Sequence, residues 1–375
     1  MAFLIFSIFF AGLLYMHFSL AHVVWSNIRG NNSQELDMSY VRVENYFGQS
    51  FRRKVRQWLK GPSETSSTGA MRVVDRGTEK VYVAGSAKYP SNRRERNVLV
   101  IEGDFSCGTE CSFERELMIE GNAAIGPGTD LQAIAVDGSL KMETGVAVRR
   151  WVDAKGAVEL IQDCNVKSKV CSGHSIFMGT GCTALSLFAP EIATEGRVEV
   201  STTQPERPGD FVLIPHAANM GNKVFHGYNP RLLYSMGGGT FLYNGDLKLT
   251  APLHVRAPLV VRGNIEVIEN CMLETDVKAH GSVRIGEGSI LKGNLVSGGN
   301  MEIGSRSFFQ GVLHSGGEMR LKHGVRGLGK SPVVAYASET LWVESNVVVR
   351  GKLASAERVK AISAPLAWLK NESGD

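Results

Sequence analysis

The sequence lacks a strong excess of charge of either sign. It has 375 residues, with 41 Lys and Arg against 37 Asp and Glu, so its formal net charge is only +4. A nucleic-acid-binding domain concentrates basic residues on one surface, whereas here they are spread along the chain. The charge pattern therefore gives no reason to expect a nucleic-acid partner.

The sequence has few of the short patterns that most often mark enzymes and metal sites. It contains no GxSxG or HExxH segment, and no paired-carboxylate arrangement stands out. Gly324–Ser331 matches GxxxxGK[ST], but Pro332 follows it at once and no helical pattern comes after it, whereas a phosphate-binding loop opens a helix. Its six cysteines include no CxxC pair and indicate no disulfide framework, which is typical of a reducing compartment. We therefore expect no enzyme activity, no cofactor and no metal ion.

Charged residues are absent from residues 2–25. A helix of that length crosses a hydrocarbon layer of roughly 30 Å, so residues 1–25 are predicted to be a transmembrane helix. Basic residues follow only on its C-terminal side, which favours a single-pass protein of the inner (cytoplasmic) membrane with its body in the cytoplasm. The alternative is a signal peptide cleaved after Ser19-Leu20-Ala21, which would make the body periplasmic.

Residues 47–60 have the spacing of a basic amphipathic helix that ends at Gly61-Pro62. Such a helix can lie on an anionic membrane or cap the domain that follows, and both can hold together. A Ser- and Thr-rich flexible linker is expected over residues 63–71, so the helix and linker together account for residues 26–71. The residues predicted to contact a membrane surface are Phe47, Phe51, Arg52, Arg53, Lys54, Arg56, Trp58 and Leu59.

Glycines recur at a spacing of 18 residues in the second half of the chain, at Gly245, Gly263, Gly281, Gly299 and Gly317. Within that spacing, a six-residue unit has apolar or small residues at its first and third positions and mostly polar residues between them. Alternation over three residues indicates a short strand, and three strands with their corners close one coil. Stacked coils place equivalent strands about 4.8 Å apart, so the inward residues form a continuous core.

This pattern predicts an all-β fold, a three-faced β-helix solenoid of roughly eleven coils, in two segments at residues 72–184 and 241–364. The register loses one residue between Leu131 and Ile134 and gains four near Gly327–Lys330. The inward positions include Leu259, Val261, Ile265, Val267, Val277, Val283, Ile285, Leu295 and Ile303.

Residues 185–240 interrupt the repeat with several prolines and the run Gly237-Gly238-Gly239. We expect an irregular insertion there, with a functional or interface role, or one or two irregular coils. Residues 365–375 are predicted to form a tail. The insertion contains His216 and His226, whereas His254, His280 and His314 fall on outward positions of the solenoid, where solvated side chains are expected.

Most of the cysteines fall on inward positions of the repeat. Free cysteine behaves as a small apolar residue in protein cores, so we expect core packing and not metal binding. Cys171 alone is expected to point outward. The cysteines predicted to lie in the core are Cys107, Cys111, Cys164, Cys182 and Cys271.

An 18-residue coil also occurs in hexapeptide-repeat acyltransferases, which have a left-handed β-helix. In those repeats a small residue usually follows the second inward position, whereas a charged residue often stands there in this chain, as in Val261-Arg262 and Leu273-Glu274. Acyl transfer, with His216 or His226 as the base, is therefore the alternative function.

Three segments of the second half share a V-x-A-x-G-x-h-x-I-G coil, in which h is aliphatic: Leu259–Val267, Val277–Gly286 and Leu295–Gly304. This coil resembles that of the bactofilins, polymer-forming cytoskeletal proteins of bacteria. The resemblance covers about residues 95–184 and 241–361. The chain differs from the family in its length, in the insertion that splits its solenoid and in its full hydrophobic span.

The resemblance implies a right-handed β-helix, nucleotide-independent polymerisation through the coil ends, and association with a membrane through the N-terminus. The expected function is a membrane-tethered structural scaffold. Its expected partners are further copies of itself, the membrane and envelope-assembly proteins.

Overall fold

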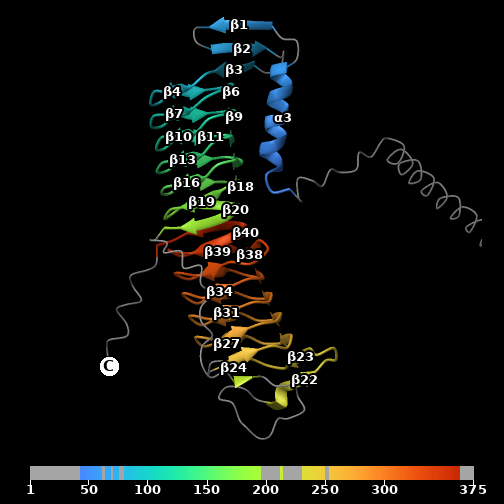
Figure 1. Ribbon diagram of the computed structural model, residues 1–375. Helices are drawn as coiled ribbons and strands as arrows, with labels where there is room; N and C mark the ends of the chain where they lie inside the picture. Colours follow the sequence, from blue (N-terminus) through green and yellow to red (C-terminus); the bar gives the residue numbers. More distant parts are fainter. Residues whose placement is uncertain are drawn as a thin grey trace, which may run out of the picture. The chain divides into compact units, whose positions relative to one another are not determined.

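The computed structural model describes residues 43–60, 64–68, 71–75, 80–195, 212–213, 230–249 and 253–363. The chain divides into a unit of residues 1–46 and a unit of residues 47–375. The second unit is an all-β solenoid of about 13 turns with coils of about 18 residues (Figure 1). The predicted fold class and coil length are confirmed, and the predicted number of coils is too low.

The first stack of coils has three faces, each built from parallel strands that pair with their equivalents one coil away. Face A contains β3 (Lys80–Ala84), β6 (Val98–Ile101), β9 (Leu117–Ile119), β12 (Ile134–Val136), β15 (Val152–Ala154) and β18 (Lys169–Ser172). Face B contains β4 (Ala87–Tyr89), β7 (Phe105–Cys107), β10 (Ala123–Ile125), β13 (Leu140–Met142), β16 (Val158–Leu160) and β19 (Ser175–Met178). Face C contains β5 (Arg94–Glu95), β8 (Ser112–Phe113), β11 (Asp130–Leu131), β14 (Ala147–Val148), β17 (Asn165–Val166) and the start of β20 (Thr183–Thr194).

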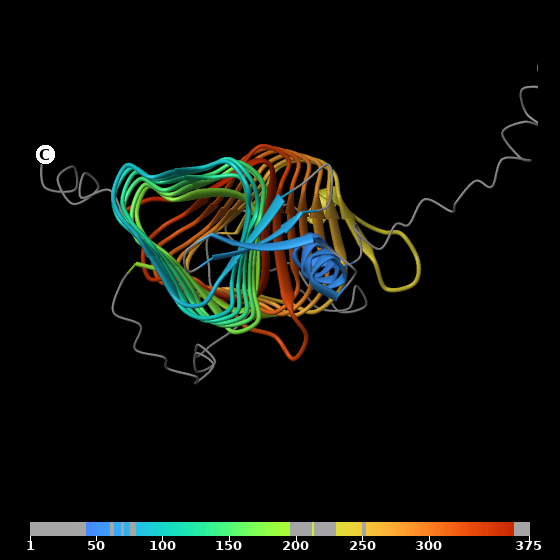
Figure 2. The same ribbon diagram turned by 90° about the horizontal axis from the view of Figure 1, so that it is seen from above.

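The second stack repeats this arrangement, and its faces take the same letters (Figure 2). Face A contains β23 (Phe241–Tyr243), β26 (Leu259–Val261), β29 (Val277–Ala279), β32 (Leu295–Ser297), β35 (Val312–Ser315) and β38 (Val333–Ala337). Face B contains β24 (Leu247–Leu249), β27 (Ile265–Val267), β30 (Val283–Ile285), β33 (Met301–Ile303), β36 (Met319–Leu321) and β39 (Thr340–Val343). Face C contains β25 (Leu253–Val255), β28 (Met272–Leu273), β31 (Ile290–Leu291), β34 (Phe308–Phe309), β37 (Arg326–Gly327) and the start of β40 (Val348–Ala361).

The outer end of each stack carries antiparallel strands. On the first stack, β1 (Glu64–Thr68) pairs with β2 (Met71–Asp75), which pairs with β3. On the second stack, a 3-10 turn (Pro230–Leu232) leads into β22 (Leu233–Ser235), which pairs antiparallel with β23, while β21 (Val212–Leu213) pairs parallel with β25. The prediction of a flexible linker is therefore wrong at Glu64–Thr68, because a strand partner stabilises these residues.

The two stacks meet at their C-terminal coils. The long strands β20 and β40 each follow most of the last coil of their own stack, and they pair with each other in antiparallel orientation. The predicted boundary of the first segment at residue 184 is wrong, because β20 continues to Thr194 in this junction. When two coils with the same handedness meet at their C-terminal ends, their chains run in opposite directions at the contact. The strands that pair there are therefore antiparallel.

The inward positions form one core that continues through both stacks. The nine inward residues predicted for the second stack, from Leu259 to Ile303, are each at most 5% exposed, which confirms the predicted core. The corners demand glycine where coils lie close together: a Cβ on Gly263 would lie 2.2 Å from Oδ1 of Asp246. The polar groups of the corners pair with the coil before, as in the bond from the Asn264 amide to Asp246 Oδ1 (2.7 Å).

Both predicted shifts of register are confirmed. Leu131 pairs with Phe113, whereas Ile134 pairs with Leu117, so one coil is a residue shorter. In the second stack, Phe309 pairs with Gly327, but Leu313 pairs with Ala335, so four extra residues lie between β37 and β38. The extra residues form a loop at the corner that follows face C.

The single α-helix in the described part of the chain is α3 (Tyr46–Lys60). It lies beside face A of the first stack (Figures 1 and 2). No helix among the described residues combines the length and the apolar character that a membrane crossing requires. The predicted transmembrane segment at residues 1–25, the tail at 365–375, His216 and His226 all lie outside the described residues.

Candidate functional site

Helix α3 packs its apolar stripe on outward-facing residues of face A. Phe51 and Val55 are buried there, and the ring centroid of Phe51 lies 5.8 Å from that of Trp151. The apolar residues that form this seat are Val74 of β2 together with Val81, Val83, Val98, Val100, Met118, Ala133, Ala135 and Trp151. Outward side chains of a solenoid are normally polar, so this apolar patch requires a cover, and α3 supplies it.

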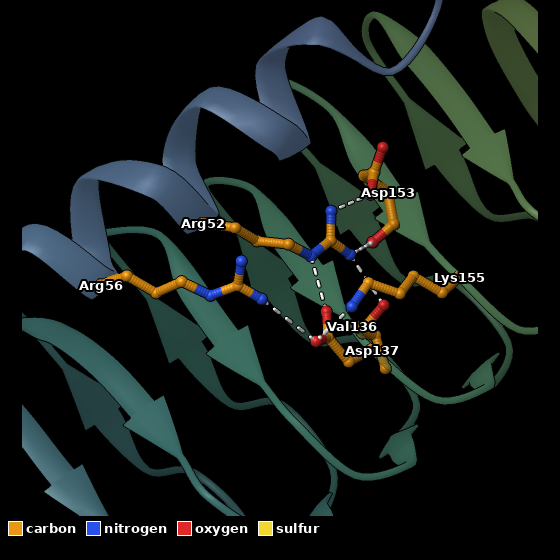
Figure 3. A network of polar contacts seen from close by, with 6 residues as sticks. All are labelled: Arg52, Arg56, Val136, Asp137, Asp153 and Lys155. Carbon is orange, nitrogen blue, oxygen red and sulfur yellow. Dashed lines mark hydrogen bonds and ion pairs between the residues drawn. The ribbon is translucent and has the colours of Figure 1, made fainter.

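Arg52 fixes the helix by inserting its guanidinium between two aspartates of the solenoid (Figure 3). Its Nε lies 2.7 Å from Oδ1 of Asp137, and its Nη1 contacts the Asp153 carboxylate. Its Nη2 donates to the carbonyl oxygens of Val136 (2.8 Å) and Asp153 (3.1 Å). The planar, multiply donating guanidinium suits such a site, and with the side chain only 5% exposed these contacts are shielded from water.

Gly48 allows α3 to approach this closely. A Cβ at position 48 would lie 2.2 Å from Cγ of Asp153, so any side chain there would push the helix away from the carboxylate that Arg52 needs. Gly48 weakens the helix intrinsically by about 1 kcal/mol relative to alanine. Close packing against the solenoid therefore explains a residue that helix propensity disfavours.

The pKa values of the two aspartates are shifted in opposite directions. Burial raises the pKa of Asp137, but hydrogen bonds and ion pairs with Lys155 and Arg52 outweigh this effect and hold the pKa below its usual value. For Asp153, burial is the stronger effect and raises the pKa despite the contact with Arg52. Asp153 Oδ2 is buried without a hydrogen-bond partner, which agrees with a costly charge at that position.

The structure divides the residues predicted to contact a membrane into two groups. Phe51 and Arg52 are buried between α3 and face A, so for these two the prediction is wrong in this fold: they contact the solenoid and not a membrane. Phe47, Trp58 and Leu59 are half-buried against the same seat. Arg53, Lys54 and Arg56 are exposed, although Arg56 Nη2 lies 4.0 Å from Oδ2 of Asp137 (Figure 3). A membrane contact by these three side chains stays a prediction.

Cys171 points outward, as expected, and is 5% exposed. The expectation that His254 is solvated is wrong. His254 is 6% exposed, and its Nε2 lies 2.7 Å from Oε2 of Glu274, so it is a buried ion-pairing residue and not a solvated one. The five cysteines assigned to the core are all buried, as expected, and none of them forms a disulfide. The described residues contain no group of three or more His, Cys, Asp or Glu side chains able to hold a metal ion.

The junction between β20 and β40 is the second site of interest. Leu187 and Leu353, both at most 1% exposed, lie opposite each other across it. The Thr194 hydroxyl lies 2.6 Å from the carbonyl oxygen of Glu344 and 3.0 Å from the amide of Val347. Hydrogen bonds thus join the two coil ends over most of their circumference.

The repeat did not reveal either site in advance. Asp137 and Asp153 look like ordinary corner and outward residues, and the register cannot show that stacks meet tail to tail. One signal was present, since the outward positions of face A in the first stack are apolar at Val98, Val100 and Met118. No protein-family model, curated protein or solved structure matches this chain.

Proposed function

We propose that this protein is a membrane-tethered, bactofilin-like structural scaffold that joins through its coil ends into a polymer without nucleotide. The observation that supports the proposal is the antiparallel junction of β20 with β40. There, the ends of two stacks of this repeat join main chain to main chain and core to core. We expect no catalytic role for any side chain.

An open solenoid end exposes an unpaired strand edge and the end of the apolar core, which favours association with a second end. In the described part of the chain, the outermost strands β1 and β22 each pair with one strand only. Contacts between copies through these outer ends would extend the molecule at both ends. A right-handed winding, as the resemblance implies, belongs to the same proposal.

Attachment to the inner membrane through residues 1–25, with the body in the cytoplasm, is part of this proposal. Helix α3 follows that segment in the chain and is fixed to the first stack by Arg52. A pull on the tether would therefore act on the solenoid through a buried ion pair. Envelope-assembly proteins are the proposed partners of the exposed faces.

Electron microscopy of the purified full-length chain in detergent, without nucleotide, tests polymerisation. Filaments or sheets are expected. A stable trimer with a cleft between chains would contradict the proposal and favour acyl transfer instead. A reporter fused to the C-terminus tests the orientation, and export of that end would contradict the cytoplasmic placement.

A matched pair of variants tests whether β22 is the contact. The Asn244 amide donates to the Leu232 carbonyl oxygen (2.8 Å), and the Met236 amide donates to the Thr240 carbonyl oxygen (2.9 Å). Because hydrogen-bonded and non-hydrogen-bonded pairs alternate in an antiparallel ladder, the Ser235 amide faces the free edge. Ser235→Pro removes that donor and is expected to shorten the filaments, whereas Ser235→Ala keeps it and is expected to leave them unchanged. Equal filament lengths for both variants would exclude pairing through this edge.

A further inference from the structure

The second stack has a groove at the corner that follows face C. Its volume is about 630 Å³, and its described lining consists of Lys292, Phe308, Gln310, Leu328, Gly329, Lys330, Ser331 and Arg350. Lys292, Gln310, Leu328 and Arg350 belong to successive coils, and Gly329, Lys330 and Ser331 belong to the extra loop between β37 and β38. The four-residue insertion into the repeat therefore forms one wall of this groove.

The floor of the groove is apolar because the outward positions of face C are apolar in this stack. Met272, Ile290 and Phe308 point outward but are each at most 6% exposed, and Leu328 packs against them. The corresponding outward residues of the first stack include Ser112, Asp130 and Asn165. These outward apolar residues of face C therefore distinguish the second stack from the first and are not required by the repeat.

The rim of the groove is basic. Lys330 and Arg350 are exposed, and neither contacts a carboxylate of the described residues, whereas Lys292 lies 2.7 Å from Oε1 of Glu274. No acidic residue belongs to the described lining. An apolar floor with cations beside it fits a short peptide in which apolar residues are followed by acidic ones.

We propose that the groove binds the chain's own C-terminal segment, residues 364–375. That segment has the matching order, with Leu366, Trp368 and Leu369 before Glu372 and Asp375. The apolar side chains would cover Phe308 and Leu328, and the carboxylates would pair with Lys330 and Arg350. The proposal is independent of polymerisation.

The segment can reach the groove. The Ile362 amide donates to the Val343 carbonyl oxygen (2.9 Å), so the chain leaves β40 beside residue 343. Arg350 follows residue 343 along one face of the coil. At about 3.3 Å per residue, the distance between the two residues is at most about 25 Å. The segment from Ser363 to Asp375 spans about 40 Å when extended, which is sufficient.

The test compares the full-length chain with a chain that ends at Ser363, using a fluorescent synthetic peptide of residues 364–375 and measuring anisotropy. The shortened chain is expected to bind the peptide. The intact chain is expected to bind it at least about tenfold more weakly, because its own segment competes at a high effective concentration. Absence of binding to the shortened chain, or equal binding by both chains, would overturn the proposal.

Variants of the shortened chain locate the site. Lys330→Glu combined with Arg350→Glu is expected to weaken peptide binding by about tenfold or more, while Lys278→Glu, an exposed lysine on face A of the same stack, is expected to have no effect. All these side chains are exposed, so unchanged thermal melting is the control for folding. A dimer of the intact chain that dissociates when the segment is deleted would instead assign the groove to the segment of a second copy.

Discussion

The two stacks have the same three-faced coil but differ in what lies on their outer surfaces. In the first stack, face A is apolar and is covered by α3, and its cover is fixed by a buried arginine. In the second stack, the outward column of face A is mixed and at least partly exposed, and consists of Leu242, Val260, Lys278, Val296, His314 and Tyr336. Face B carries ion pairs such as Lys248 with Glu266 (2.9 Å). The repeat thus determines the interior, while outward residues decide what each stack can bind.

The interiors of the two stacks also differ, although the same positions of the repeat point inward in both. Near its outer end the first stack is filled by the rings of Tyr89, Phe105 and Phe113, whose centroids lie 5.6–5.8 Å apart. The second stack contains inward serines, and the Ser289 amide donates to Ser307 Oγ (3.2 Å) in the next coil. An inward position therefore accepts a small polar residue when the neighbouring backbone supplies its hydrogen bonds.

The largest effect is expected from Val283→Asp in the second stack. Val283 is 2% exposed, and a carboxylate there would be buried without a partner, which costs more than about 4 kcal/mol and disrupts neighbouring coils. Chemical denaturation followed by circular dichroism measures the loss. Arg284→Ala on the same strand, 65% exposed in its side chain, is the control and is expected to change stability little. Similar stabilities for the two variants would contradict the inward register.

Arg52→Ala tests the cover of the first stack. Removal of one partner from a buried ion pair costs about 3–5 kcal/mol. In Arg52→Ala, Asp153 loses its ion-pair partner, while Asp137 keeps its contact with Lys155 (2.6 Å). Hydrogen exchange of the α3 amides is expected to accelerate strongly while the second stack keeps its protection. Arg53→Ala, an exposed neighbour, is the control, and unchanged α3 protection in Arg52→Ala would contradict the assigned role of Arg52.

Leu187→Ala tests how strongly the stacks are coupled. The cavity is expected to cost about 3 kcal/mol and to separate the unfolding of the two stacks into two transitions, because Leu187 lies in the junction. Leu313→Ala, a fully buried leucine within the second stack, creates a similar cavity away from the junction. If calorimetry shows the same number of transitions for both variants, the junction does not couple the stacks.

The smallest effect is expected from the pH dependence of Glu274. Hydrogen bonds from Lys292 and His254 lower its pKa from 4.5 to about 2, despite partial burial. Because the folded pKa is lower than the unfolded one, this stabilisation is complete above about pH 4.5 and is lost as the pH falls towards 2. Glu274→Gln is expected to remove it, by less than about 1 kcal/mol, because solvent screens the pair. Thermal melting between pH 2 and 6 measures the difference, and parallel curves for both proteins would contradict it.

The sequence correctly predicted the side chains whose inward orientation is fixed by the geometry of the coil. The inward residues, the two register shifts and the five core cysteines follow from the spacing, because a three-residue strand places its first and third side chains on the same side. It failed for His254, which points outward from a coil, and for Arg52, which lies on helix α3. The burial of both side chains depends on what other parts of the chain pack against them.

The sequence by itself determined a repetitive β-solenoid, since fixed spacing imposes the same local geometry on every coil. Only the tertiary structure decided that two stacks meet tail to tail through β20 and β40, and that α3 covers one of them. Both contacts join residues far apart in the chain. They depend on the complementarity of two surfaces, which a periodic pattern within either surface does not encode.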